Sequence, residues 1–328
     1  MNIKHLKCFL QVAEIGSLTQ AAAVLCIAQP ALSRQIQQLE DELAVTLFRR
    51  SERGVTLTEA GRLLQQRAAP LLMNFDNLKQ EMRDAFNEPS GTVVLAMPPS
   101  LFDLLTMPTV REYQRTYPDV FLRLYEGISA VMNASAMVQC GSADLAVVTN
   151  TEPLATLENR PFVTEPLCLI GPVEAQLDQH GSIDLHTVST LPLVITSRPN
   201  TLRLLLETAV ATAGLPLNIV MEANSSAALL GAVEAGVGYT VLPFSGGYKM
   251  QLHGRVSIAP VADIQVSWNT VQLRAQALST GATRLLDLLQ STAKAQIECG
   301  LWRHARMPAP NAPAGRSGIP ARNLSSVA

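Results

Sequence analysis

The chain has 328 residues, of which 48% are hydrophobic, so it is long enough for two or three domains that each bury a core. Its formal net charge is only −2, but the charges are segregated. Positions 1–67 hold eight basic and six acidic residues, thirteen basic and twenty-one acidic residues follow, and the segment from Arg303 onward holds four arginines and no acid. Phosphate groups are therefore attracted to the two ends and repelled by the middle. No signal-peptide pattern and no apolar run of about 18 residues occurs, which predicts a cytoplasmic protein without a membrane contact.

Three short helices are predicted near the N-terminus. Apolar residues recur every three or four positions between Leu6 and Ala13, and Gly16 is a typical helix end. Ser17 is a suitable N-cap for a second helix, which is rich in alanine and therefore allows close approach of another helix. Pro30 favours the first turn of a third helix with an apolar face of its own.

A hairpin and then one long helix are predicted next. The β-prone residues 55–57 follow a charged, glycine-containing turn at 50–54, as in a hairpin wing. From Thr58 to about Asn87, apolar residues alternate spacings of four and three, so the helix favours a dimer, although one helix packed on its own domain is the alternative. Pro70 lies inside this repeat and predicts a kink. The repeat positions are Leu64, Ala68, Leu71, Phe75, Leu78, Met82 and Ala85.

The residues after a break at Pro89-Ser90-Gly91 alternate between strand-like and helical patterns, which predicts an α/β domain with largely parallel sheets. The strand-like segments are 92–97, 121–125, 144–149, 193–196, 217–221 and 239–242, and the helical ones are 104–114, 130–138, 201–213 and 227–234. The tail 303–328 is rich in Pro, Ala, Gly and Arg without periodicity, and we expect it to be disordered.

Residues 17–43 have the layout of a helix-turn-helix, in which the second helix presents its N-terminal residues to the major groove of DNA. Gln29 lies where its amide can read adenine, and Ser33 and Arg34 lie one turn on, within reach of a phosphate or a guanine. An ordinary solvated helix start is the alternative. Three arginines at the predicted wing are suited to a narrow minor groove or a phosphate: Arg49, Arg50 and Arg53.

The segments GSLTQAAAVLCIAQPALSRQIQQLEDEL and LFRRSERGVTLTEAG resemble the signature of LysR-type transcriptional regulators, and the resemblance is dense over residues 3–61. Together with TMPTVREYQRTYPDV, they most resemble the nitrogen assimilation control proteins of that family. By this resemblance Arg53 is the wing contact, and the recognition element consists of Gln29, Pro30, Ala31, Ser33 and Arg34. Ala28 departs from the Ser or Thr that many relatives use to cap the recognition helix.

The resemblance also implies an architecture: an α-helical winged helix-turn-helix domain followed by an effector domain of two α/β lobes similar to periplasmic binding proteins. Its expected units are a DNA-binding domain (1–58), a dimerising linker helix (59–89), an effector domain (90–302) with lobe I at 92–162 and 266–302 and lobe II at 163–265, and the tail (303–328). It further implies a sequence-specific regulator that binds double-stranded DNA as a homodimer or homotetramer, with RNA polymerase as a partner.

A cleft between two such lobes, with helix N-termini facing it, is suited to a small anionic metabolite acting as co-inducer. Regulators of the group it resembles also work without one. The expected lining lies at strand-to-helix junctions, where plain caps and turns are the alternative. A glycine-containing stretch after residue 242 is expected to close the far side. The candidate effector-binding residues are Pro99, Ser100, Thr149, Ser197, Asn200, Thr201, Phe244 and Gly246.

No catalytic or metal-binding pattern is present in the sequence. The five histidines lack ligand spacing and the five cysteines form no CxxC pair, which is typical of reduced buried thiols. We therefore predict that the chain is not an enzyme and needs no cofactor or metal. An effector-independent architectural DNA-binding protein is one alternative. A solute-binding protein is another, but it would call for a secretion signal and no DNA motif.

Overall fold

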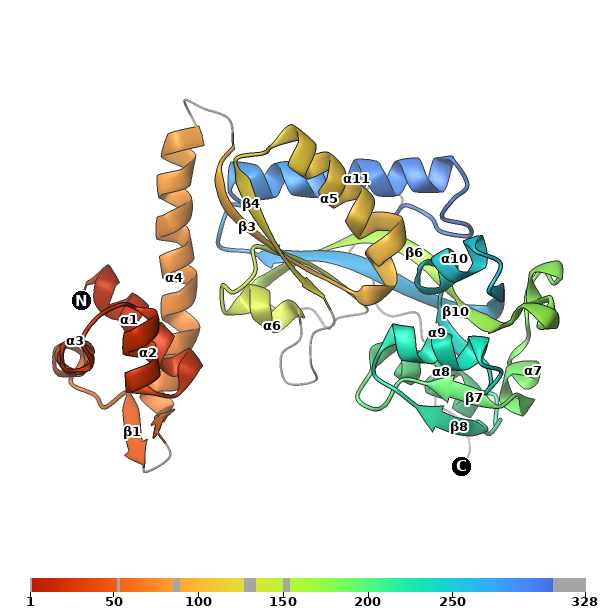
Figure 1. Cartoon of the computed structure of the whole chain (residues 1–328), viewed down its shortest axis with the longest axis horizontal. Helices are drawn as coiled ribbons and strands as arrows, with labels where there is room; N and C mark the ends of the chain where they lie inside the picture. The colour runs from red at the N-terminus through yellow and green to blue at the C-terminus, as the bar shows by residue number, and fades with distance from the viewer. Residues whose placement is uncertain (1, 52–53, 85–88, 127–133, 150–153, 309–328) are drawn as a thin grey trace, which may run out of the picture.

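The computed structural model describes residues 2–51, 54–84, 89–126, 134–149 and 154–308. A small helical unit at the N-terminus is joined by one long helix to a larger α/β unit (Figure 1). No helix within the described ranges is long and apolar enough to cross a membrane. The N-terminal unit contains three helices and a hairpin: α1 (Ile3–Ile15), α2 (Leu18–Val24), α3 (Gln29–Leu43), β1 (Phe48–Ser51) and β2 (Gly54–Leu57).

The caps expected from the sequence are confirmed in this unit. Gly16 ends α1 in the left-handed conformation (φ 72°), and the Ser17 side chain accepts a hydrogen bond from the backbone N–H of Gln20 at the start of α2. Ala28 precedes α3 without a side-chain cap. The wing is confirmed as an antiparallel hairpin, and its Val55 N–H donates to the Gly16 carbonyl at 2.9 Å. The hairpin is therefore fixed to the turn between α1 and α2.

The linker helix α4 (Glu59–Asp84) begins at Thr58, whose Oγ1 accepts a hydrogen bond from the Gly61 N–H at 3.0 Å. The helix continues through Pro70, so this proline does not end it, and the kink expected there stays a prediction. The apolar repeat was expected either to form a dimer or to pack on its own domain, and its two parts differ in this respect. Its first part packs on the core of the N-terminal unit, where Ala68 is 1% exposed, whereas three members of its second part are exposed and Phe75 is partly buried. The exposed members are Leu71, Leu78 and Met82, and Ala85 lies outside the described residues.

The α/β unit is built on a six-stranded sheet in the order β4-β3-β5-β10-β6-β9 and a two-stranded parallel sheet, β7-β8. All six expected strand segments are confirmed within about two residues at their ends. Their bounds are β3 (Gly91–Met97), β4 (Val120–Glu126), β5 (Leu145–Thr149), β7 (Leu193–Ile195), β8 (Ile219–Glu222) and β9 (Thr240–Pro243).

The two longest strands, β6 (Leu157–Pro172) and β10 (Val256–Leu273), are absent from the sequence-based prediction. Pro161 and Pro166 lie inside β6 and Pro260 lies inside β10, and proline argues against a strand because it cannot donate to the ladder. The register between the two strands shifts after Pro260, which accommodates that residue. Because β6 and β10 run antiparallel to each other and to their outer neighbours, the expectation of largely parallel sheets is wrong for the large sheet.

Helices cover this sheet and fill the second lobe. Four predicted helices are found, although the first begins with a 3-10 turn (Pro99–Leu101) and a π-helical turn (Phe102–Thr106), and part of 130–138 lies outside the described residues. Three more helices, α7, α10 and α11, are additional to the prediction. The bounds are α5 (Met107–Thr116), α6 (Ala134–Gln139), α7 (Leu185–Thr190), α8 (Thr201–Thr212), α9 (Ser226–Glu234), α10 (Phe244–Leu252) and α11 (Thr280–Glu298).

Part of the tail expected to be disordered is ordered. Arg306 forms an isolated antiparallel bridge with Thr164 on β6, with N–H to carbonyl distances of 2.9 and 2.8 Å. Trp302, just before the expected boundary, is 1% exposed. Burial of this indole, which composition alone does not reveal, holds the segment on the sheet. Residues 309–328 lie outside the described residues.

Asp144, which precedes β5, makes the stability of this fold depend on pH. It is 8% exposed and accepts a hydrogen bond from the Val94 N–H at 2.7 Å, and burial raises its pKa to about 6. The unfolded pKa is about 3.9, so the folded state binds more protons, and stability falls as pH rises from about 4 to about 6.5. Asp144→Asn keeps an oxygen acceptor without a charge. We expect it to raise the free energy of unfolding at pH 7.5 by on the order of 1–3 kcal/mol and by nothing below about pH 4.

Denaturant unfolding of both proteins across this pH range measures the difference. The exposed Asp119→Asn substitution is the control and should leave the difference near zero at every pH. Parallel pH profiles for wild type and Asp144→Asn would contradict the assignment.

Candidate nucleic-acid interface and ligand cavity

The outward face of α3 carries the residues expected to contact DNA. Leu32, Ile36 and Leu39 are buried against the rest of the N-terminal unit, which turns the opposite face of the helix outward. Pro30 and Arg34 are exposed on that face. The other three expected residues, Gln29, Ala31 and Ser33, are partly exposed in the same two turns. The structure thus brings all five together at the N-terminal end of one helix.

Two side-chain contacts fix α3 relative to its surroundings. The Cys8 thiol donates to Gln35 Oε1 at 2.8 Å, linking α1 to α3, and burial raises the pKa of this thiol. Glu40 Oε1 accepts hydrogen bonds from the backbone N–H groups of Leu47 at 2.6 Å and Phe48 at 3.2 Å. Because Glu40 lies on α3 and Phe48 begins the wing, the helix and the wing form one rigid surface.

Of the three arginines expected at the wing, only Arg49 has a side chain that the structure describes. Arg49 is exposed on β1, Arg50 belongs to the same strand, and Arg53 lies outside the described residues. An open groove of about 720 Å³ runs along the base of the wing, lined by Arg49 and also by Arg62 of α4. The sequence-based prediction omits Arg62. Its place just after the wing, in the first turn of a helix that starts there, is the signal that could have identified it.

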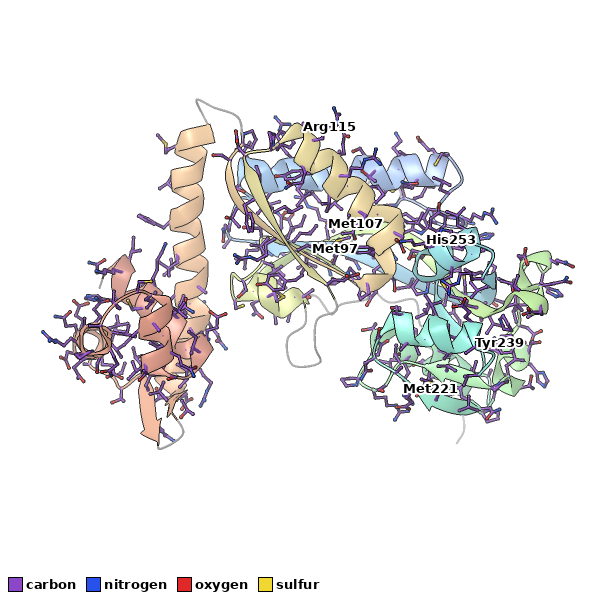
Figure 2. The ribbon with its side chains drawn as sticks, viewed as in Figure 1. Met97, Met107, Arg115, Met221, Tyr239 and His253 are labelled. Atoms are coloured by element: carbon purple, nitrogen blue, oxygen red, sulfur yellow. The ribbon has the colours of Figure 1, made fainter. Side chains whose placement is uncertain are left out.

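A second cavity, of about 380 Å³, lies between the two lobes of the α/β unit. Five of the eight expected effector-binding residues line it: Pro99, Ser100, Thr149, Asn200 and Thr201. Met97, which ends β3 and is labelled in Figure 2, forms part of its wall with Trp268 of β10. The remaining lining residues are Pro98, Ala134, Ser135, Val147, Val148, Thr196, Leu202, Asn224, Ser226 and Leu242.

Three expected residues are not in this lining. Ser197 lies beside it, and its N–H donates to the lining residue Asn224 at 3.2 Å. Phe244 and Gly246 belong to the first turn of α10, where a closing loop was expected, because the helix follows β9 directly. Phe244 is 3% exposed, and a Cβ on Gly246 would lie 3.4 Å from Ser100. Both residues therefore pack behind the cavity wall.

The electrostatics of the cavity come from backbone dipoles. None of its described lining residues is charged at neutral pH. The N-termini of α8 and α9 reach the cavity at Thr201 and Ser226. Asn200 caps α8 by accepting from the Leu202 and Arg203 N–H groups, whereas the side chain of Ser225, the N-cap of α9, makes no capping bond. The first turn of α9 thus offers N–H donors and a positive dipole end to a bound group.

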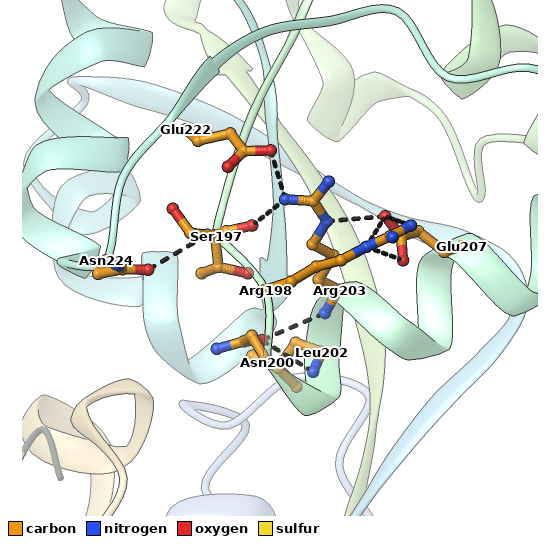
Figure 3. Close-up of polar contacts among 9 residues, drawn as sticks. Ser197, Arg198, Asn200, Leu202, Arg203, Glu207, Glu222 and Asn224 are labelled. Carbon is orange, nitrogen blue, oxygen red and sulfur yellow. Dashed lines mark hydrogen bonds and ion pairs between the residues drawn. The ribbon is translucent and has the colours of Figure 1, made fainter. Parts of the chain in front are cut away.

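A buried arginine holds the loop that carries one side of the cavity. The Nη1 atom of Arg203 donates to the Thr196 carbonyl at 2.9 Å and to Glu222 Oε1 at 2.6 Å, and its Nε donates to Glu207 Oε1 at 2.7 Å (Figure 3). Arg198 Nε donates to the same Glu207 carboxylate at 3.2 Å. The hydrogen bond from Arg203 lowers the pKa of Glu222. This network ties the loop before α8 to β8 and so fixes the position of the lining residues.

Two family models match the chain. The first, described as a bacterial regulatory helix-turn-helix protein of the lysR family, matches residues 3–62. The second, described as the LysR substrate binding domain, matches residues 86–294. The first match covers the helix-turn-helix unit, and the second covers the domain that contains the cavity.

Curated relatives extend the similarity over almost the whole chain. The nitrogen assimilation regulatory protein nac of Escherichia coli (strain K12) is 31% identical over 301 residues, which cover 90% of this chain and 97% of the relative. The protein of the same name from Klebsiella aerogenes is 33% identical, over 76% of this chain and 81% of the relative.

Solved structures have the same fold. A full-length OxyR variant from Pseudomonas aeruginosa has a TM-score of 0.72 at 21% identity, covering 94% of this chain and 99% of that chain. Full-length CbnR in complex with its target DNA has a TM-score of 0.60 at 19% identity, covering 89% and 100%. Full-length BenM has a TM-score of 0.54 at 25% identity, covering 92% and 98%. The two family models and the curated relatives together show that this chain belongs to the LysR family of DNA-binding transcriptional regulators.

Proposed function

We propose that this regulator binds a partly palindromic operator as a homodimer or homotetramer. We further propose that a small anionic metabolite in the interlobe cavity changes how the protein binds this DNA. The observation that carries the proposal is the rigid surface formed by α3 and the wing, with α4 leading from it to the cavity-bearing unit. Two-fold symmetry of the protein predicts two-fold symmetry of its DNA site.

The similarity to the nac proteins supports a role in nitrogen assimilation for the genes under its control. We infer that the protein acts in the cytoplasm, where promoter DNA is found, and changes transcription through RNA polymerase. We also infer that it is a regulator without catalytic activity and without a cofactor, because both matching family models describe regulator domains. An effector-independent regulator is the second candidate, favoured by a cavity lined with no charged side chain in the described residues.

The DNA contacts are proposed in two classes. Gln29 is assigned to base reading in the major groove, since an amide can make a bidentate pair with adenine. Arg34, Arg49 and Arg62 are assigned to phosphates or the minor groove, where they supply affinity and salt dependence. Arg49 and Arg62 share the groove at the base of the wing, so one backbone segment of the operator fits along it.

Gln29→Ala should lower affinity for the operator about tenfold and leave affinity for random DNA unchanged, because a bidentate base contact is worth roughly 1–3 kcal/mol. Arg49→Ala should weaken both and reduce the slope of log affinity against log salt by about 1. Fluorescence anisotropy with labelled duplexes at several salt concentrations measures both effects. Gln38→Ala, exposed on the same helix nearer its C-terminal end, is the matched control. Equal losses on operator and random DNA for both variants would overturn the assigned roles.

The oligomer is proposed to form along the exposed apolar side chains of α4. Leu71, Leu78 and Met82 are 56%, 56% and 61% exposed, at spacings of seven and four that place them along one side of the helix. Apolar residues at such spacing are covered by a partner helix in coiled coils, and a second copy of this chain presents the same surface.

Leu78→Glu should shift the sedimentation coefficient toward the monomer and lower operator affinity at least tenfold, because it places a charge in the proposed interface. Leu204→Glu introduces the same change at a side chain of α8 that is 62% exposed, and it should alter neither quantity. If Leu78→Glu sediments as wild type does, the self-association of α4 is wrong.

The anion proposal is tested with acetate, succinate and citrate as probes in isothermal titration. We expect at least one of them to bind with a millimolar or lower Kd, and Ser226→Asp to abolish this binding, because a fixed carboxylate would occupy the N-terminus of α9. Thr280→Asp places the same charge in the first turn of α11, away from the cavity, and should retain binding. Absence of binding for all three probes at about 10 mM would favour the effector-independent candidate.

A further inference from the structure

A buried carboxylate lies at the point where the two lobes meet. Glu165, on β6, is 1% exposed and accepts four hydrogen bonds, all from neutral donors. Its Oε1 accepts from Trp268 Nε1 at 2.7 Å and from Ser245 Oγ at 2.7 Å. Its Oε2 accepts from the Ser245 N–H and from Trp302 Nε1, each at 3.0 Å. Three segments far apart in the sequence therefore converge on one side chain.

Burial of Glu165 costs free energy because a carboxylate loses its hydration when it leaves water. Burial raises the pKa of Glu165, and the hydrogen bonds from Trp302, Ser245 and Trp268 oppose that rise. The Ser245 N–H belongs to the first turn of α10, so the positive end of that helix also faces the carboxylate. A buried acceptor that loses one donor is left partly unsatisfied. Loss of any one donor therefore destabilises the buried carboxylate in this position, and with it the segments that the other donors hold there.

The donors connect the cavity to the C-terminal segment, which we define as residues 300–307. Trp268 lines the cavity and lies opposite Thr149, another lining residue, in the ladder between β10 and β5. Trp302 belongs to the C-terminal segment, which pairs with β6 through Arg306 and Thr164. Because Thr164 is the neighbour of Glu165 in β6, the side-chain contact and the backbone pairing reinforce each other.

We propose that Glu165 is a positioning residue for the effector cavity, which holds the Trp268 wall through one oxygen and the C-terminal segment through the other, so that a displacement of Trp268 loosens that segment. The inference rests on the proposed role of the cavity as an effector site. An occupant that moves the Trp268 indole would then change the pairing of Arg306 with β6, far along the chain from the cavity wall. The C-terminal segment would then be a second part of the protein, besides the DNA-binding unit, that responds to the occupant of the cavity.

Trypsin cleavage of the full-length protein after Arg306 reports on this pairing. Both backbone groups of Arg306 bond to Thr164 in the structure, so cleavage requires that the segment leave the sheet. Intact-mass spectrometry follows the product, and the synthetic peptide GLWRHARMP gives the upper limit of the rate. No effector is needed, so the measurement stands apart from the anion titration: its failure would leave the cavity's role as a sensor untouched.

Trp268→Phe removes the cavity-side donor and should raise the cleavage rate after Arg306 at least fivefold. Tyr113→Phe is the matched control, since it also removes a buried aromatic donor, which bonds the Gly281 carbonyl at 2.8 Å in another part of the domain. It should change the rate less than twofold. In the Ser245→Ala and Glu165→Gln backgrounds, Trp268→Phe should add less than twofold, because the shared carboxylate contact is already weakened.

Two results would overturn the proposal: Trp268→Phe and Tyr113→Phe giving the same rate, or the effects of Trp268→Phe and Glu165→Gln multiplying independently. If Glu165→Gln fails to fold, as circular dichroism would show, Ser245→Ala completes the cycle alone. Tryptophan emission supplies a second readout, because the chain has only two tryptophans and both donate to Glu165. Ser245→Ala should red-shift the emission of both the Trp268→Phe and the Trp302→Phe proteins, and a shift in neither would contradict the proposal.

Discussion

The antiparallel pairing of β6 with β10 is the contact on which the effector domain depends. These strands run through both lobes, join β5 on one side to β9 on the other, and so make one sheet from two halves. The cavity lies where these two strands pass from one lobe to the other. Trp268 of β10 forms part of its wall, and Glu165 of β6 lies directly behind that indole. A displacement of one lobe therefore strains this ladder, and it also strains the contact between Lys249 of α10 and Asp103, which lie 3.1 Å apart. Closely packed interiors transmit such strain because they have few voids to absorb it.

The DNA-binding unit is likewise held together by a few contacts between its elements. Burial of the apolar face of α3 turns its polar face outward, and Glu40 joins that helix to the wing through two backbone N–H groups. The linker α4 packs its first half on this unit, and Leu71, Leu78 and Met82 farther along it are exposed, so the helix belongs both to the DNA-binding core and to the proposed dimer. A rigid surface of this kind suits two half-sites whose separation is set by the protein.

The sequence predicts the helix-turn-helix almost completely because each local signal agrees with the fold: Gly16 ends a helix, Ser17 begins one, and the β-prone residues after Gly54 form the wing. It fails where tertiary contacts override local preference. Prolines within β6 and β10 conceal the two central strands, and their antiparallel course reverses the expected sheet type. The strand-to-helix junctions predict five lining residues of the cavity, whereas Trp268 and Asn224 need the three-dimensional structure, since neither stands at a recognisable motif. Glu165 is likewise an ordinary polar residue in the sequence, and only the convergence of two indoles and a helix N-terminus identifies it.

We propose above all that this LysR-family regulator recognises a two-fold DNA site through α3 and the wing, and that a ligand in the interlobe cavity changes how it binds that site. Footprinting of the purified protein on the intergenic DNA beside its own gene, at a fixed salt concentration and with and without metabolite extract, tests both halves together. We expect protection of a long, partly palindromic site whose extent changes with the extract. Protection that follows no two-fold pattern, or the absence of specific protection there and elsewhere in the genome, would contradict it.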